Sequence, residues 1–169
     1  MTIMSLGPDE IPESTLVSLV DRLNRTTRRK WAALGLLRKV PRGAGYREHD
    51  ATELAAFFEL QKELGSYYDA VAGWNGGIRN ALREAVEGEA AGNSKRLIAL
   101  FDAAAQEGTL VTKEAEIGSY VMREQRRDHF FRAIDLGEPV TGARAAFWRA
   151  VEARNLRPSS VSSNFEKDQ

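Results

Sequence analysis

Apolar positions recur with a helical period soon after the chain begins. Between Ser14 and Leu23 they fall every three or four residues, which places them on one side of a helix: Leu16, Leu19, Val20 and Leu23. A second helix is predicted from a cap at Thr26 or Thr27 to Gly35, because glycine commonly ends a helix. Two short helices joined by a tight turn are typical of a helix-turn-helix.

The pattern then changes from helical to turn-forming. Pro41, Gly43 and Gly45 interrupt any helix, while Val40 and Tyr46 can lie in short strands on either side of the turn. This segment therefore predicts a small two-stranded wing after the second helix.

A longer helix is predicted after the wing. Asp50 and Glu53 have the spacing of a capping box, and the apolar pattern continues to a stop at Gly65. From Tyr67 to Glu87 the pattern is again helical, but three glycines interrupt it. We expect a broken helix in that segment.

The second half of the chain predicts three further helices. Leu97, Leu100, Phe101 and Ala104 have helical spacing, and amphipathic helices are also expected around residues 113–134 and 142–154. Because neither of the last two helices is stable alone, we expect these two to pack on each other as a helical module, while the helix from Leu97 could fold back as a hairpin.

Together these elements predict a mainly α fold, in which a winged helix-turn-helix with a two-stranded wing is followed by a helical C-terminal module. The expected divisions are a flexible lead-in over residues 1–10, a winged domain over 11–75, a helical dimerisation or accessory module over 76–157, and a disordered polar tail over 158–169.

The charges are balanced in number but segregated along the chain. The protein has 24 basic and 24 acidic residues, yet residues 22–47 contain nine basic residues and no acidic one. A solvated face normally mixes both signs, so this span predicts a surface that meets an anion, and nucleic acid is the commonest large anion in the cytoplasm. Its basic residues are Arg22, Arg25, Arg28, Arg29, Lys30, Arg38, Lys39, Arg42 and Arg47.

The residue types exclude most other chemistry. The chain has no cysteine, and its two histidines, His49 and His129, are far apart in sequence, so we expect no metal site and no cofactor. His129 beside Asp128 could act as a general base, but no nucleophile or phosphate-binding glycine loop accompanies it, and we expect the protein not to be an enzyme. Nothing resembles a signal peptide or a membrane span, so a cytoplasmic, nucleoid-associated location is expected.

Several of these features occur in the order and spacing of one known family. Three segments resemble the winged helix-turn-helix of MerR-type transcription regulators, within about residues 14–75: Thr27 to Leu37, Gly45 to His49, and Asp50 to Gly65. The resemblance implies that Thr27 and Arg29 contact DNA from the second helix, and that Tyr46 and Arg47 contact it from the wing. The chain departs from the family pattern at Arg28, Lys30, Trp31 and His49.

The chemistry of the basic residues leads to the same interface. One of Arg28 and Arg29 is expected to bind a guanine edge and the other a phosphate, because neighbouring helix residues point in different directions. Trp31 is expected in the core, whereas Tyr46 could either pack under the wing or donate a hydrogen bond to phosphate. The remaining expected DNA contacts are Arg25, Lys30, Lys39 and Arg42.

These observations predict a sequence-specific double-stranded DNA-binding protein that regulates transcription, for example as a repressor, with the second helix in the major groove and the wing on the backbone. Two alternatives stay open: an architectural or phage excision-type DNA-binding factor, and a protein-binding adaptor on a winged fold. The assembly also stays open between a homodimer and a monomer that makes a second DNA contact through arginines of its C-terminal half.

Overall fold

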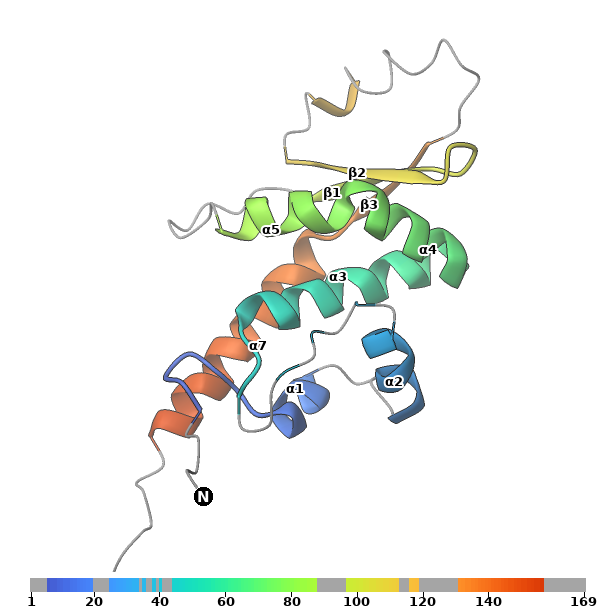
Figure 1. Ribbon diagram of the computed structural model, residues 1–169. Helices are drawn as coiled ribbons and strands as arrows, with labels where there is room; N and C mark the ends of the chain where they lie inside the picture. Colours follow the sequence, from blue (N-terminus) through green and yellow to red (C-terminus); the bar gives the residue numbers. More distant parts are fainter. Residues whose placement is uncertain are drawn as a thin grey trace, which may run out of the picture.

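Helix α3 (Glu48–Leu64) crosses the middle of the molecule and organises the fold (Figure 1). The short helices α1 (Glu13–Leu19) and α2 (Arg25–Ala33) lie on one side of it, and α7 (Gly137–Asn155) runs along α3 as far as α1. A computed structural model describes residues 6–19, 25–33, 35, 38, 40, 44–87, 97–112, 116–118 and 131–156, with the backbone alone described at 25–28 and 87.

A small sheet and three consecutive helical elements lie on the other side of α3. Helix α4 (Tyr67–Gly73), the π-helical turn η1 (Trp74–Ile78) and α5 (Arg79–Glu87) follow one another and pack against the sheet. The sheet is antiparallel with strand order β2-β1-β3. Its strands are β1 (Ile98–Asp102), β2 (Glu107–Val111) and β3 (Phe131–Asp135).

The contact between η1 and β2 depends on glycine. Gly77 has a φ of 152°, and a Cβ atom there would lie 2.7 Å from the carbonyl oxygen of Gly108. No side chain could occupy that position without displacing backbone. The glycines that predicted an interruption after Tyr67 therefore allow the chain to approach the sheet closely.

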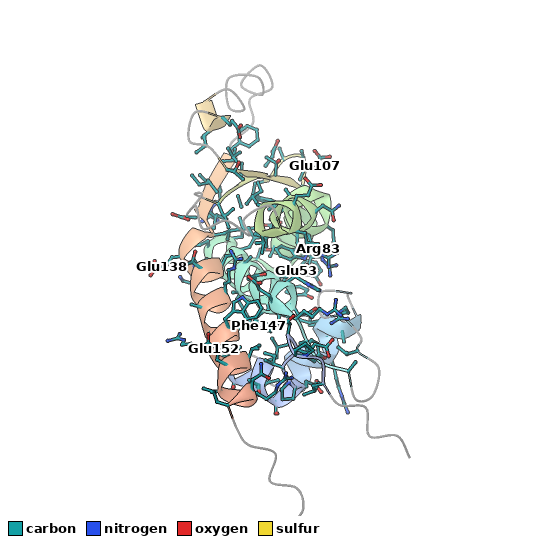
Figure 2. The ribbon with its side chains drawn as sticks, turned by 90° about the vertical axis from the view of Figure 1, so that its left-hand side faces the viewer. Glu53, Arg83, Glu107, Glu138, Phe147 and Glu152 are labelled. Carbon is teal, nitrogen blue, oxygen red and sulfur yellow. The ribbon has the colours of Figure 1, made fainter. Side chains whose placement is uncertain are left out.

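One hydrophobic core joins both halves of the chain. The buried cluster extends from Ile11 through α3 to Val151. Phe147 is fully buried on α7 and points toward α3 (Figure 2). The segments predicted as a winged domain and a separate helical module thus share this core.

Several sequence predictions are confirmed. The fold is mainly helical, α1 and α2 overlap the two segments predicted as helices, and Gly35 after α2 has the left-handed φ of 69° expected of a helix stop. The predicted cap at Thr26 or Thr27 is wrong, because both residues lie inside α2, and residues 20–24, where the first helix and the tight turn were expected to end, lie outside the described residues. Gly65 ends α3 with a φ of 67°, and its N–H donates to the Gln61 carbonyl. Helix α7 confirms the predicted helix at 142–154, although it begins five residues earlier, at Gly137.

The helix predicted from Leu97 to Ala104 is wrong, because this segment forms strand β1 and the start of a turn. Of the helix expected at 113–134, residues 116–118 are helical, residues 131–134 belong to strand β3, and the rest lie outside the described residues. Residues 97–101 are all apolar, and in so short a run the spacing fits a buried strand as well as a helix. Strand β1 is the central strand and is buried along most of its length, which explains the continuous apolar run.

The start of α3 also differs from the prediction. The helix begins at Glu48 after Arg47, and Asp50 occupies the third helical position rather than the cap. The Asp50 carboxylate accepts a hydrogen bond of 2.8 Å from the Arg47 backbone N–H. An acidic residue at the third position serves the helix start in this way, as glutamate does in a capping box.

The two-stranded wing was predicted from Val40 and Tyr46, but Tyr46 pairs elsewhere. Its backbone N–H and carbonyl each bond to Ile11 at 2.9 Å, in an isolated antiparallel bridge. Val40 belongs to no strand, and the expected turn residues 41–43 lie outside the described part of the chain. The strand partner thus comes from the N-terminal segment, which brings Ile11 into the core.

The N-terminal lead-in is held in place from residue 6 onward. The Arg154 guanidinium of α7 donates hydrogen bonds to the carbonyls of Gly7 (2.7 Å), Pro8 (2.9 Å) and Glu10. Gly7, Pro8 and Glu10, which were expected to belong to a flexible lead-in, are therefore bound to α7. The predicted disordered tail, residues 158–169, lies outside the described residues.

Candidate nucleic-acid interface

Helix α2 is fixed to the fold through one aromatic side chain. Trp31 is 1% exposed, and its ring packs edge-on against Phe57, 5.0 Å between centroids, and at a tilt against Phe58, 4.3 Å between centroids. This confirms that Trp31 is a core residue. With Trp31 facing α3, the preceding residues Arg29 and Lys30 are both exposed.

Arg29 is an unengaged cation on this surface. Among the described residues it has no hydrogen bond or ion pair, although Arg38 and Arg47 of the same acid-free span both have acidic partners. A guanidinium in this state can bind a new acceptor without first breaking an internal contact.

Lys30 has a different environment from Arg29. Its Nζ atom lies 3.7 Å from the centroid of the Tyr67 ring, a cation–π contact that joins α2 to α4. Burial raises the pKa of the Tyr67 phenol, so the ring stays neutral at physiological pH. Lys30 is therefore an exposed residue of α2, and its contact with Tyr67 also helps to hold that helix against α4.

Five expected contacts lie where the structure describes no side chain. Arg25, Thr27 and Arg28 lie on α2, of which only the backbone is described at these positions. Lys39 and Arg42 lie outside the described residues.

Tyr46 lies in the core. The sequence left open whether Tyr46 packs inside the protein or donates a hydrogen bond to phosphate. Its side chain is only 6% exposed, so it packs inside the protein. The expected contact of Tyr46 with phosphate has no support from this placement, because the ring is covered by the protein itself.

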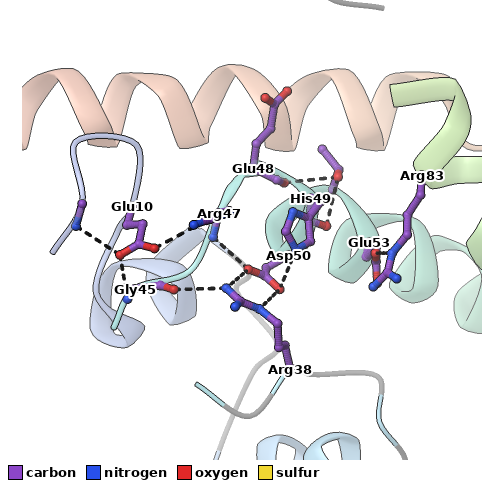
Figure 3. Close-up of polar contacts among 11 residues, drawn as sticks. Glu10, Arg38, Gly45, Arg47, Glu48, His49, Asp50, Glu53 and Arg83 are labelled. Atoms are coloured by element: carbon purple, nitrogen blue, oxygen red, sulfur yellow. Dashed lines mark hydrogen bonds and ion pairs between the residues drawn. The ribbon is translucent and has the colours of Figure 1, made fainter. Parts of the chain in front are cut away.

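Arg47 is accessible but has one internal partner. Its side chain is 63% exposed, and its Nε–H donates to the Glu10 carboxylate at 3.4 Å (Figure 3). Glu10 also accepts hydrogen bonds of 3.1 Å from the N–H groups of Gly7 and Gly45. These two backbone donors, together with Arg47, hold the pKa of the Glu10 carboxyl below its usual value.

Arg38 braces the segment between α2 and α3. Its guanidinium donates to both oxygens of Asp50, at 3.3 and 3.1 Å, and to the Gly45 carbonyl at 3.2 Å (Figure 3). The hydrogen bond to Asp50 raises the pKa of Arg38. Sequence reasoning missed this role because the carboxylate partner, Asp50, lies outside the acid-free span.

The described arginines of the C-terminal half mostly bind the protein itself. Arg132 donates to the carbonyls of Glu63 and Leu64 at 2.6 and 3.4 Å, Arg144 pairs with Glu48, and Arg154 holds the N-terminal segment. Arg149 is exposed, without a partner among the described residues. Arg123, Arg126, Arg127 and Arg157, and with them His129, lie outside the described part.

The described residues contain no group of three histidine, cysteine or acidic side chains placed to hold a metal ion. None of the helices described here is both long and apolar enough to cross a membrane.

Comparison with known proteins adds no further constraint. No protein-family model matches the chain, and neither a curated protein nor a solved structure is detectably similar to it.

Proposed function

We propose that this chain is a sequence-specific double-stranded DNA-binding protein that regulates transcription, with α2 as the helix that enters the major groove. In this proposal α1 and α2 are the helix pair of a winged helix-turn-helix of MerR type, and α3 supports them. The observation that carries the proposal is the exposed and unengaged Arg29 on a helix fixed by Trp31.

Each cation has a distinct part in the proposed complex. Arg29 binds a guanine through two hydrogen bonds, a contact worth about 1–3 kcal/mol of discrimination between bases. Lys30, next to Arg29 on α2, and Arg47, at the residue before α3, bind phosphates and fix the register of the helix. Because Arg47 uses only its Nε–H internally, its terminal nitrogens are available as further donors.

The test compares two exposed arginines that both lack partners among the described residues. A preferred duplex is first selected from random sequences, and its affinity is measured for the wild type, Arg29→Ala and Arg149→Ala. We expect Arg29→Ala to weaken binding to the selected duplex by about 5- to 150-fold, from the 1–3 kcal/mol above, and to change non-specific binding much less.

The control variant separates the proposal from its alternatives. Arg149→Ala, on α7, should leave both affinities unchanged. Equal losses in the two variants would contradict the assignment of α2, and a loss in Arg149→Ala alone would favour a DNA contact through the C-terminal half.

A further inference from the structure

A cavity of about 320 Å³ lies between the start of α3 and the middle of α7. This volume is at the lower end of the range of small-molecule sites, about 300–1,000 Å³. None of its lining residues lies on α2, and Arg47 alone is shared with the proposed DNA contacts, so the proposed recognition helix does not account for the cavity.

One part of the lining is apolar and aromatic. Phe147 is fully buried, Val86 is half-buried, and Trp148 keeps 37% of its surface exposed. The rings of Phe147 and Trp148 meet edge to face, 5.5 Å apart between centroids. By contrast, Trp31 and Trp74 are each 1% exposed. Trp148 thus presents ring surface to the cavity that a flat apolar group can cover.

The other part of the lining offers one charge of each sign. Asp9 has no hydrogen bond or ion pair among the described residues, and Arg47 is bound through its Nε–H alone. The remaining opposite charges, Arg144 and Glu48, pair with each other. A ligand therefore meets a free carboxylate and the free end of a guanidinium beside an indole ring.

We propose that this cavity binds a small zwitterion, an α-amino acid with an aromatic or large apolar side chain. Its ammonium group is held by Asp9, its carboxylate by the terminal nitrogens of Arg47, and its side chain against the exposed ring of Trp148. A simple anion would be repelled by Asp9, and a simple cation by Arg47, so the two residues together select a molecule with both charges.

The test uses L-phenylalanine on the full-length wild-type protein without DNA, so its result does not depend on the proposed function. Tryptophan emission excited near 295 nm reports on the exposed Trp148, and ligand-observed NMR serves as a second measurement. We expect a saturable change with L-phenylalanine. 3-Phenylpropanoate lacks the ammonium group and phenethylamine lacks the carboxylate, so each should bind at least about tenfold more weakly, because each loses one charge-assisted contact.

Variants locate the site. Asp9→Asn and Arg47→Gln should each weaken L-phenylalanine binding by about tenfold or more. Glu152→Gln and Arg149→Ala, on exposed positions of α7 outside the cavity, should not change it. The inference is overturned if both measurements find no saturable binding of L-phenylalanine, or if 3-phenylpropanoate binds as tightly. The ligand series on the wild type decides the question even if a variant fails to fold.

Discussion

Removing the Trp31 side chain tests how α2 is held. The ring is 1% exposed and contacts two phenylalanine rings of α3. Truncation of a buried tryptophan to alanine costs about 3–5 kcal/mol, from lost burial and the cavity left behind. Aromatic pairs of this kind contribute about 0.5–1.5 kcal/mol each beyond area burial, so we expect Trp31→Ala in the upper part of that range.

Urea denaturation followed by far-ultraviolet circular dichroism measures this loss independently of tryptophan fluorescence. Trp148→Ala is the matched control, because that ring is 37% exposed and should cost far less than Trp31→Ala. Trp31→Phe keeps a ring in the site and should recover much of the stability. If Trp31→Ala and Trp148→Ala reduce the free energy of unfolding equally, α2 is not fixed to α3 as described.

Three further substitutions test other contacts. Because the folded pKa of Glu10 lies below its usual 4.5, its stabilisation is complete above that pH and is lost as the pH falls below it. The difference in melting temperature between the wild type and Glu10→Gln should therefore be largest near neutral pH and vanish in acid; a constant difference would contradict this. Glu53→Gln leaves Arg79 and Arg83 without their buried carboxylate and should cost about 1–3 kcal/mol in urea denaturation, whereas Glu59→Gln, which loses a more exposed pair, should cost no more than about 1 kcal/mol. Similar losses of stability in Glu53→Gln and Glu59→Gln would show that the burial of Glu53 does not strengthen its ion pairs. Gly77→Ala should lower the melting temperature because its Cβ meets the Gly108 carbonyl, while Gly142→Ala on α7 has open space and should raise it; a stable Gly77→Ala would contradict the close contact of η1 with β2.

The helical N-terminal half could largely be predicted from the sequence, because its signals are local. Gly35 and Gly65 mark the ends of two helices through their left-handed backbone, and the spacing of apolar residues marks the buried sides. The sheet could not be predicted in the same way. The five apolar residues at the start of the Leu97–Ala104 segment fit either a helix or a strand, and only pairing with β2, across a short turn, and with the distant β3 selects the strand.

The candidate site could be predicted only in part. The acid-free span locates the exposed Arg29 and Arg47, but it does not distinguish an available cation from a structural one. Arg38 is engaged by Asp50, twelve residues away, and Arg47 by Glu10, thirty-seven residues away. Such pairing depends on tertiary contacts, and so does the burial of Tyr46 against the N-terminal segment.

The salt dependence of duplex binding tests the central claim most directly. Fluorescence anisotropy of a labelled, selected duplex gives the affinity of the wild-type protein at several salt concentrations. If about six phosphates are neutralised, the logarithm of the affinity should fall with the logarithm of salt concentration with a slope of about −5. Failure to bind any duplex at low salt, or binding that does not respond to salt, would contradict a DNA-binding function and favour a protein-binding adaptor.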